Sequence, residues 1–180
     1  MTSITTYTKK TFDPLAPDIE LIDIVDIAHA LSLLCRANGH FPEFYSVGRH
    51  SLNCMIEARA RGYSERVRLA CLLHDASEAY LSDVTRPVKS ALPQYKEIET
   101  VLQNLIYTKW LGSAPSDEEY YLMRTVDDAM LYCEMIHYFG EKVSDNVPEI
   151  LSSPVFAFEG FEKTEREFIR AFNERYLCCQ

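Results

Sequence analysis

The strongest constraint on this chain is the spacing of its apolar residues, which recur at steps of three and four positions over most of its length. Such spacing places apolar side chains on one face of a helix. The segment that begins at Asp23 shows it first, at Ile24, Ile27, Ala28 and Leu31. Glycines and prolines stand mostly between the periodic segments, where they separate helices. We therefore predict an all-α bundle of about six or seven helices.

Capping residues and glycine or proline stops predict where the helices begin and end. Helices are expected from Asp23 to near Asn38 and Gly39, from near Ser46 to before Gly62, from Ser64 through His74 and Asp75, from Tyr95 to Trp110, from the capping-box pair Ser116 and Glu119 to about Phe139, and over GFEKTEREFIRAFNERYL. Before them, the segment from Ser3 to Phe12 alternates Thr, Tyr and aliphatic residues. That alternation predicts a short β-ribbon or an extended arm.

Length and composition predict a single domain. A chain of 180 residues has the usual size of one domain, and its 47% of apolar residues can form one core. We expect residues 1–22 to form an N-terminal arm or β-ribbon, residues 23–140 to form the core, and residues 141–180 to form a C-terminal loop and helix. The six cysteines form no CxxC pair and are expected to be reduced packing residues.

The charge of the chain restricts its partners. It has 18 basic and 27 acidic residues, a formal net charge of -9. Binding a polymeric nucleic acid requires a basic surface, so that class of partner is not expected. A small phosphorylated substrate remains compatible, because a few cations in one pocket can reverse the local charge. No run of ~20 apolar residues could span a membrane and the start lacks an apolar signal, so we expect a cytoplasmic protein without membrane contact.

Two histidines and two aspartates are the best candidates for a metal site. His74 and Asp75 are adjacent, His50 belongs to the preceding predicted helix, and Asp127 belongs to a later one. Helical proteins build metal sites from ligands on facing helices, and mixed imidazole and carboxylate ligands suit Mn, Fe, Co, Ni or Zn. A His-Asp pair alone is a weak signal, because both residue types are common. The order H, HD, D along successive helices gives the pair its significance.

With these residues in this order, the sequence resembles the HD-domain phosphohydrolase superfamily. It is most similar to a small phage and prophage branch that is related to bacterial 5'-deoxynucleotidases and phage deoxynucleoside triphosphohydrolases. The resemblance extends from about Asp23 to Glu134, and it is carried by DIAHALSLLCRANGH, FYSVGRHS, LLHDASEAYLSDVTRPVK, LPQYK and VDDAML. It implies a single HD domain in which residues 23–140 are the catalytic core.

The resemblance also implies one divalent metal ion, with coordination positions left for water and for a phosphate oxygen. The implied ligands are His50, His74, Asp75 and Asp127. The identity of the metal stays open among Co, Mn, Zn, Fe, Ni and Mg. We choose Asp127 over Asp128 because its seven-residue offset to Glu134 matches the pattern of the branch.

Two acidic residues beyond the His-Asp pair are candidates for proton transfer. Glu78 lies four residues after His74 and can share its helix face, and Asp83 follows in the next turn or loop. Both match catalytic acidic positions of the family. We expect them to orient the attacking water and to manage protons for the leaving oxygen, with the division between them left open.

Four other residues are candidates for substrate contacts. The resemblance implies that Arg36 binds phosphate, and a guanidinium can grip two phosphate oxygens. Lys89 is the second phosphate candidate and would be most useful for a longer polyphosphate. His40 is either a substrate contact, as the RxxGH arrangement of relatives implies, or a loop residue. Tyr45 is either a contact to the nucleotide base or a packed aromatic residue.

The expected function is metal-dependent removal of phosphate from deoxynucleoside 5'-monophosphates. Release of triphosphate from a deoxynucleoside triphosphate, as in a dATPase, is the main alternative, and hydrolysis of a guanosine polyphosphate alarmone is another. A non-catalytic nucleotide sensor that keeps the HD fold is the rival from a different class. The expected partners are the nucleotide and further copies of the chain, because small relatives are typically homo-oligomers.

Overall fold

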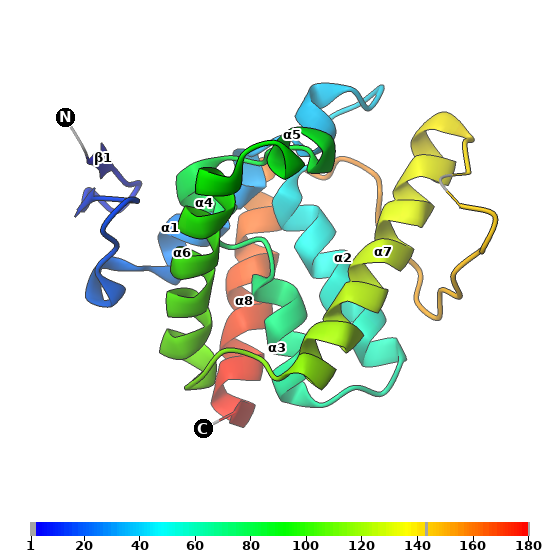
Figure 1. The fold of residues 1–180 in the computed structure, drawn as a ribbon. Coiled ribbons are helices and arrows are strands. Elements are labelled where there is room, and N and C mark those ends of the chain that lie inside the picture. Colours follow the sequence, from blue (N-terminus) through cyan, green and yellow to red (C-terminus); the bar gives the residue numbers. More distant parts are fainter. Residues whose placement is uncertain (1–2, 143, 180) are drawn as a thin grey trace.

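The computed structural model describes residues 3–142 and 144–179, and within them it confirms the predicted all-α fold (Figure 1). The α-helices are α1 (Ile24–Leu33), α2 (Val47–Ala60), α3 (Glu65–Leu73), α4 (Glu78–Leu81), α5 (Arg86–Ser90), α6 (Pro93–Leu111), α7 (Asp117–Phe139) and α8 (Phe161–Cys179). Two 3-10 helices, η1 (Ile19–Leu21) and η2 (Arg36–Gly39), flank α1. Strands β1 (Ile4–Thr5) and β2 (Thr11–Phe12) pair antiparallel and form the predicted ribbon.

The expected division of the chain at residues 22 and 140 stays a prediction. Four of its residues, Met1, Thr2, Val143 and Gln180, lie outside the described part of the chain. Within that part, no helix combines the length and the apolar character that crossing a bilayer would require.

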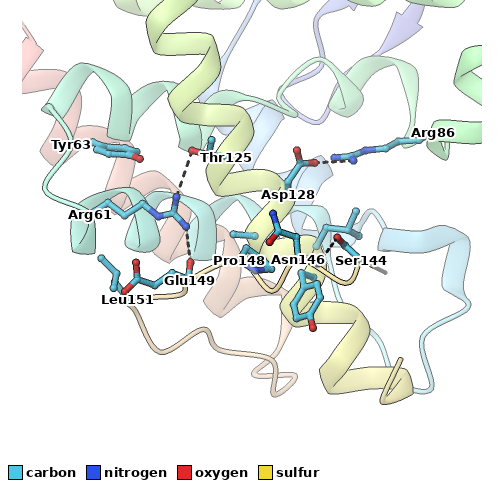
Figure 2. A pocket seen from close by; sticks show the side chains of 13 residues that line it. Arg61, Tyr63, Arg86, Thr125, Asp128, Ser144, Asn146, Pro148, Glu149 and Leu151 are labelled. Carbon is cyan, nitrogen blue, oxygen red and sulfur yellow. Dashed lines mark hydrogen bonds and ion pairs between the residues drawn. The ribbon is translucent and has the colours of Figure 1, made fainter. Parts of the chain in front are cut away.

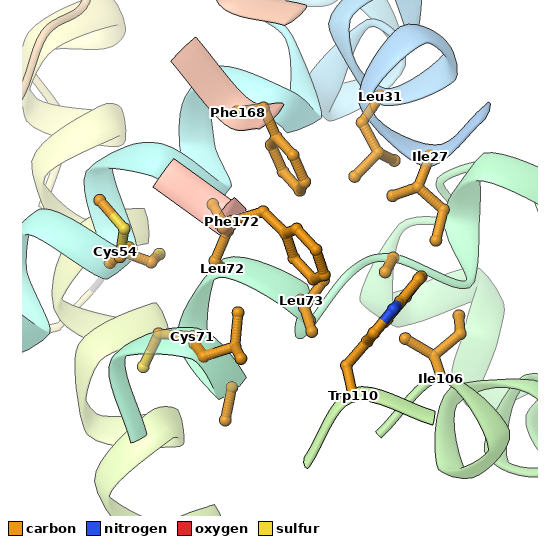
Figure 3. Packing of buried hydrophobic residues seen from close by; sticks show 14 of the residues in the cluster. Ile27, Leu31, Cys54, Cys71, Leu72, Leu73, Ile106, Trp110, Phe168 and Phe172 are labelled. Carbon is orange, nitrogen blue, oxygen red and sulfur yellow. The ribbon is translucent and has the colours of Figure 1, made fainter. Parts of the chain in front are cut away.

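Helix α3 lies at the centre of the bundle. It packs against α2, α6, α7 and α8, and α8 also packs against α1 and α2. Apolar side chains from these helices fill the space between them, among them Leu72, Leu73, Trp110, Phe168 and Phe172 (Figure 3). The apolar spacing that predicted the helices therefore corresponds to one main core, which holds α2, α3 and α7 in fixed positions.

Three predicted helix starts, at Ser46, Ser64 and Ser116, are confirmed by their caps, whereas the helix expected from Tyr95 begins two residues earlier, at Pro93. The Ser46 hydroxyl accepts a hydrogen bond from the backbone N–H of Arg49, and the Ser64 hydroxyl accepts one from that of Val67. Ser116 and Glu119 form a complete capping box at the start of α7. Each cap satisfies a backbone donor that the first helical turn leaves without a partner.

The first long helix ends before its predicted boundary. After α1 the chain pairs with the segment that precedes α2: the backbone N–H of Val47 donates to Leu34 O at 3.0 Å, and that of Arg36 donates to Tyr45 O at 2.9 Å. These bonds replace the helical ones, so Arg36 belongs to η2 and not to the end of a continuous helix.

The third predicted helix is divided in two, and the side chain of Gln103 explains the break. In a continuous helix the N–H of Ser77 would donate to Leu73 O. Here Ser77 N donates to Gln103 Oε1 at 3.0 Å, and Gln103 Nε2 donates to Leu73 O at 2.8 Å. The amide of α6 is thus inserted into the hydrogen-bond ladder between α3 and α4. His74 and Asp75 consequently lie in the turn between these helices.

The segment before α8 is fixed to α2 by two buried polar residues. Asn53 exchanges two hydrogen bonds with the backbone of Val155. Glu57 accepts hydrogen bonds from the backbone N–H groups of Leu151 and Ser152 and from the Ser152 hydroxyl, and its Oε1 lies 2.8 Å from Arg61 Nε. Burial alone would raise the pKa of Glu57, but these hydrogen bonds outweigh it and lower the pKa.

We expect Glu57→Gln to reduce the free energy of unfolding by about 1–3 kcal/mol at neutral pH, because buried donors lose a charged acceptor. A carboxylate with a lowered folded-state pKa stabilises the fold above its ordinary pKa of 4.5 and loses that contribution as the pH falls through the folded-state value. The difference between wild type and variant should therefore shrink in acid. Urea unfolding at several pH values measures the difference, with Glu97→Gln at an exposed position of α6 as the control. A constant difference at all pH values would contradict the assignment.

Candidate metal centre

Four predicted ligands meet in the bundle interior. His50 lies on α2, His74 and Asp75 lie in the turn after α3, and Asp127 lies on α7. The Nε2 atoms of the two histidines are 3.2 Å apart. Asp127 Oδ1 lies 3.2 Å from His50 Nε2, and Asp75 Oδ2 lies 3.2 Å from His74 Nε2. Residues from three separate segments thus form one cluster of nitrogen and oxygen atoms.

Cys54 belongs to the same cluster, which sequence reasoning missed. Its Sγ lies 3.5 Å from His50 Nε2. Ligand atoms of His50, Cys54, His74 and Asp127 all lie within 4.8 Å of one another, and this group could hold a metal ion. The signal was present in the sequence, because Cys54 follows His50 by four residues and therefore shares its helix face. Burial raises the pKa of the Cys54 thiol to about 11.

Hydrogen bonds at the outer nitrogens orient both imidazoles. His74 Nδ1 lies 2.7 Å from the backbone oxygen of Cys71, which can only accept, so Nδ1 carries the proton. His50 Nδ1 lies 2.5 Å from Glu134 Oε1. In neutral imidazoles with these tautomers, both Nε2 lone pairs face the cluster centre, where they would repel each other without a cation. Metal-binding histidines are commonly oriented in this way by their other nitrogen, so the donor set fits a divalent ion.

The electrostatics of the cluster favour positive charge. Burial disfavours the ionised form of Asp127, but the hydrogen bond from His50 and the neighbouring cations lower its pKa. The pKa of Asp75 is also lowered, because the charge and hydrogen bond of His74 outweigh burial. Burial lowers the pKa of His74, yet Asp75 reverses this and raises it. The negative surroundings that raise the pKa of His74 would stabilise a metal cation in the same way. The helical fold and this cluster are compatible with an HD-type fold.

Arg36 lies beside the cluster and is joined to it through Glu134. Its Nε donates to Glu134 Oε2 at 2.9 Å, while NH1 lies 3.6 Å from Asp75 Oδ2 and NH2 lies 3.8 Å from Asp127 Oδ1. The last two distances are ion-pair contacts and exceed hydrogen-bond length. The structure therefore places the predicted phosphate contact at the cluster, with both terminal amino groups directed toward it.

The two predicted proton carriers have distinct surroundings. Glu78 is buried, and its Oε2 has no hydrogen-bond partner among the described residues. Burial, with Asp75 and Asp83 nearby, raises the pKa of Glu78 to about 10, so it carries a proton at neutral pH. Asp83 is half-buried, and burial raises its pKa as well. Lys89 Nζ lies 3.6 Å from Glu78 Oε1 and 2.6 Å from Glu99 Oε1.

Three other residues from the sequence analysis lie away from the ligand atoms. Tyr45 is buried, packs against the rings of Phe41 and Tyr138, and accepts a hydrogen bond from Asn53 on its hydroxyl. Its ring is thus part of a small aromatic core. His40 is exposed, and the hydrogen bonds and ion pairs of residues 3–142 and 144–179 include none between it and the cluster. Asp128 is half-buried next to Asp127 and pairs with Arg86 instead of with the two histidines.

Arg86 is a site residue that sequence reasoning did not identify. Its NH2 donates to Asp127 Oδ2 at 2.8 Å, and its NH1 donates to Asp128 Oδ1 at 2.9 Å. Figure 2 shows the bond to Asp128. The two oxygens of Asp127 thus have different partners: Oδ1 faces His50, and Oδ2 accepts a hydrogen bond from Arg86. No sequence motif indicated this role, because the contact joins α5 to a residue 41 positions later.

We expect Arg86→Gln to weaken divalent-metal binding about 10- to 100-fold, as the loss of a group that orients a ligand does in other metal sites. Competition with a chelating dye, with Mn²⁺ or Co²⁺ added singly, measures the dissociation constant. The matched control is Arg124→Gln, because Arg124 Nε lies 3.6 Å from Asp128 Oδ2 and is not paired with Asp127. Equal affinities for the two variants would show that Arg86 does not orient the ligand.

Two cavities flank the Arg86 contact. One of about 810 Å³ lies between the end of α2, the middle of α7 and the segment before Leu151, and Arg61, Tyr63 and Asp128 line it (Figure 2). None of the predicted metal ligands lines this larger cavity. The other, of about 320 Å³, lies between α6 and α7 and is lined by His74, Asp75 and Asp127. The smaller cavity is therefore the one that reaches the cluster.

Comparison with known proteins identifies relatives but no activity. No family model matches the chain. Over 146 residues the chain is 38% identical to "Uncharacterized protein RCAP_rcc00048" of Rhodobacter capsulatus, a match that covers 75% of this chain and 71% of that protein. Over 112 residues it is 36% identical to "Uncharacterized protein YfdR" of Escherichia coli, which covers 61% of this chain. The chain spans 59% of the length of YfdR.

Proposed function

We propose that this chain, which belongs to the family of the Rhodobacter capsulatus protein RCAP_rcc00048, is a metal-dependent phosphohydrolase of the HD superfamily that removes phosphate from deoxynucleoside 5'-monophosphates. The observation that carries the proposal is the cluster in which two oriented imidazoles and two carboxyl groups converge beside the buried side chain of Glu78, whose pKa is raised to about 10 by burial and neighbouring carboxylates. Metal ligands next to an acid with a strongly raised pKa are typical of hydrolytic sites.

We assign His50, His74, Asp75 and Asp127 as the ligands of one divalent ion. Asp75 is taken as the fourth ligand because the resemblance to the HD superfamily implies it and its Oδ2 lies 3.2 Å from His74 Nε2. Cys54, whose Sγ lies 3.5 Å from His50 Nε2, is the alternative donor. A bound divalent ion supplies Lewis-acid charge for the phosphate oxygens and lowers the pKa of water. The donor types leave the metal open among Mn, Fe, Co, Ni, Zn and Mg.

Arg36 binds the phosphate in this proposal. Its Nε is already bonded to Glu134, which fixes the plane of the guanidinium. The terminal amino groups are held only by long ion pairs, so phosphate oxygens can replace the carboxylates as their partners. Arg36 thereby orients the phosphorus for attack from the side of the cluster.

The proton balance assigns separate roles to the two acids. Glu78 carries a proton at neutral pH and donates it to the leaving 5' oxygen. Asp83 accepts a proton from the attacking water. One P–O bond to water forms and the P–O bond to the sugar breaks, so the products are a nucleoside and inorganic phosphate. The different surroundings of the two carboxyl groups determine which of them acts as the acid.

The charges around the site favour a monophosphate over a triphosphate. Arg36 pairs with Glu134, and Lys89 pairs with Glu99 at 2.6 Å. A triphosphate would bring more negative charge to a site whose cations already have carboxylate partners. Analysis of the released product as phosphate or triphosphate distinguishes the two activities directly.

We expect Asp75→Asn and His74→Ala to lose metal binding and activity together, because each removes a ligand. Glu78→Gln should keep the metal and lower kcat about 10²- to 10⁴-fold, the usual contribution of a general acid. Cys54→Ser, the matched control within the cluster, should retain both properties. Elemental analysis and phosphate release from the four deoxynucleoside monophosphates with Mn²⁺, Co²⁺ or Mg²⁺ provide the measurements.

Two outcomes would overturn the proposal. If the wild type binds nucleotide and gains thermal stability but releases no phosphate with any metal, the protein is a nucleotide sensor. If Glu78→Gln is fully active, the buried acid does not serve the reaction. Loss of metal from Cys54→Ser would instead replace Asp75 by Cys54 in the ligand set.

A further inference from the structure

The cavity of about 320 Å³ beside the metal cluster continues between α6 and α7 to a second polar end. Its first end is formed by His74, Asp75 and Asp127. At its other end the hydroxyl of Tyr120, on α7, donates to Asn104 Oδ1, on α6, at 3.3 Å. The two helices run in roughly opposite directions and are joined by a short loop near this second end (Figure 1). The cavity therefore has one end suited to a phosphate and another with different chemistry.

The spacing along α7 sets the distance between the two ends. Tyr120 and Asp127 are seven residues apart, which is about two helical turns, so both lie on the face of α7 that lines the cavity. Their separation along the helix axis is about 10 Å, at 1.5 Å per residue. This span is comparable with the reach from the 5'-phosphate of a nucleotide to its base. A phosphate at the cluster would thus direct the base toward Tyr120.

The second end offers an aromatic surface and an amide. Tyr120 is 39% exposed, and its ring is supported by an edge contact with the buried ring of Tyr107. Met123 is buried and lines the apolar side of the cavity. Asn104 Oδ1 is bonded to Tyr120, which leaves its amide N–H groups to donate. Apolar walls with a few directed polar groups are usual in small-molecule sites.

The neighbouring amide of Gln103, which also lines the cavity, already has a structural role. Its oxygen accepts from Ser77 N and its nitrogen donates to Leu73 O, and these bonds hold the turn that carries His74. Of the two adjacent amides on α6, Asn104 is thus the one that can recognise a ligand. Recognition of a base requires both a stacking surface and a hydrogen-bonding group, and the second end supplies both.

We propose that Tyr120 and Asn104 form the nucleobase subsite of this enzyme, in which Tyr120 stacks on the base and Asn104 donates hydrogen bonds to its edge. This inference rests on the proposed function, because it places the phosphate at the metal cluster. It predicts that the site selects a nucleotide over phosphate monoesters that lack a base. It also predicts that the enzyme prefers bases whose edge carries hydrogen-bond acceptors for the amide N–H groups of Asn104.

The test compares nucleotides with the same phosphate ester lacking a base. KM and kcat are measured for dAMP, dGMP, dCMP and dTMP and for 2-deoxyribose 5-phosphate, with Mn²⁺ or Co²⁺ present. We expect Tyr120→Ala to raise KM for the nucleotides roughly 5- to 100-fold, the range found for loss of base stacking, and to leave 2-deoxyribose 5-phosphate unchanged. Tyr120→Phe should retain most of the affinity. Asn104→Leu should alter the ratio of KM values among the four bases.

Tyr121→Ala is the matched control. Tyr121 is 68% exposed, adjacent to Tyr120 and not among the residues that line the cavity. It should leave every constant unchanged. Thermal melting of each variant checks that the fold is kept, and Tyr120→Phe distinguishes loss of the ring from loss of the hydroxyl.

The outcomes separate this inference from the proposed function. If Tyr120→Ala changes the constants for both kinds of substrate equally, or for neither, the subsite assignment is wrong even though hydrolysis stands. If the wild type hydrolyses none of these substrates, calorimetric titration with dAMP and with 2-deoxyribose 5-phosphate still tests whether Tyr120 and Asn104 bind the base. A preference for dAMP that disappears in Tyr120→Ala would support the subsite, and equal binding of the two compounds would refute it.

Discussion

The buried carboxylate of Glu134 is the contact on which the site depends. It has no exposed surface, and it binds both His50 Nδ1 and Arg36 Nε. Burial raises its pKa, but the charge of Arg36 and the contact with His50 outweigh this and lower it. One ionised side chain on α7 thus orients an imidazole from α2 and a guanidinium from η2. A buried charge is stable only when it is paired with an opposite charge or hydrogen-bonded. The contacts of Glu134 therefore hold α2, α7 and η2 together.

The inserted amide of Gln103 has a comparable effect on the other half of the cluster. In a continuous helix, successive side chains point about 100° apart around the axis, so the adjacent His74 and Asp75 would point in different directions. The break after α3 allows the turn to present both His74 and Asp75 toward α2, while Glu78 starts a new helix and points into the interior. In this turn the N–H groups of Ala76 and Glu78 bond to the residue three positions earlier, and Gln103 supplies two further hydrogen bonds, to Ser77 N and Leu73 O.

Acidic side chains a few residues apart are assigned different protonation states by their surroundings. Asp75 lies against His74 and has a lowered pKa, whereas Glu78 is buried near two other carboxyl groups and has a pKa of about 10. One of them is therefore suited to hold a cation and the other to hold a proton. In the proposed function, this difference would let one carboxyl group bind the metal and the other supply a proton.

The expected ligand set of His50, His74, Asp75 and Asp127 came from the resemblance to a family. The spacing of residues in the sequence determined the helical fold and the caps at Ser46, Ser64 and Ser116. These features depend on spacing within short segments, where helical geometry relates position to direction. Only the tertiary structure decided that Gln103 divides a predicted helix and that Arg86 holds Asp127. Those contacts, and the pKa of Glu78, arise from burial and from neighbours on other segments, and periodicity along the chain carries no information about them.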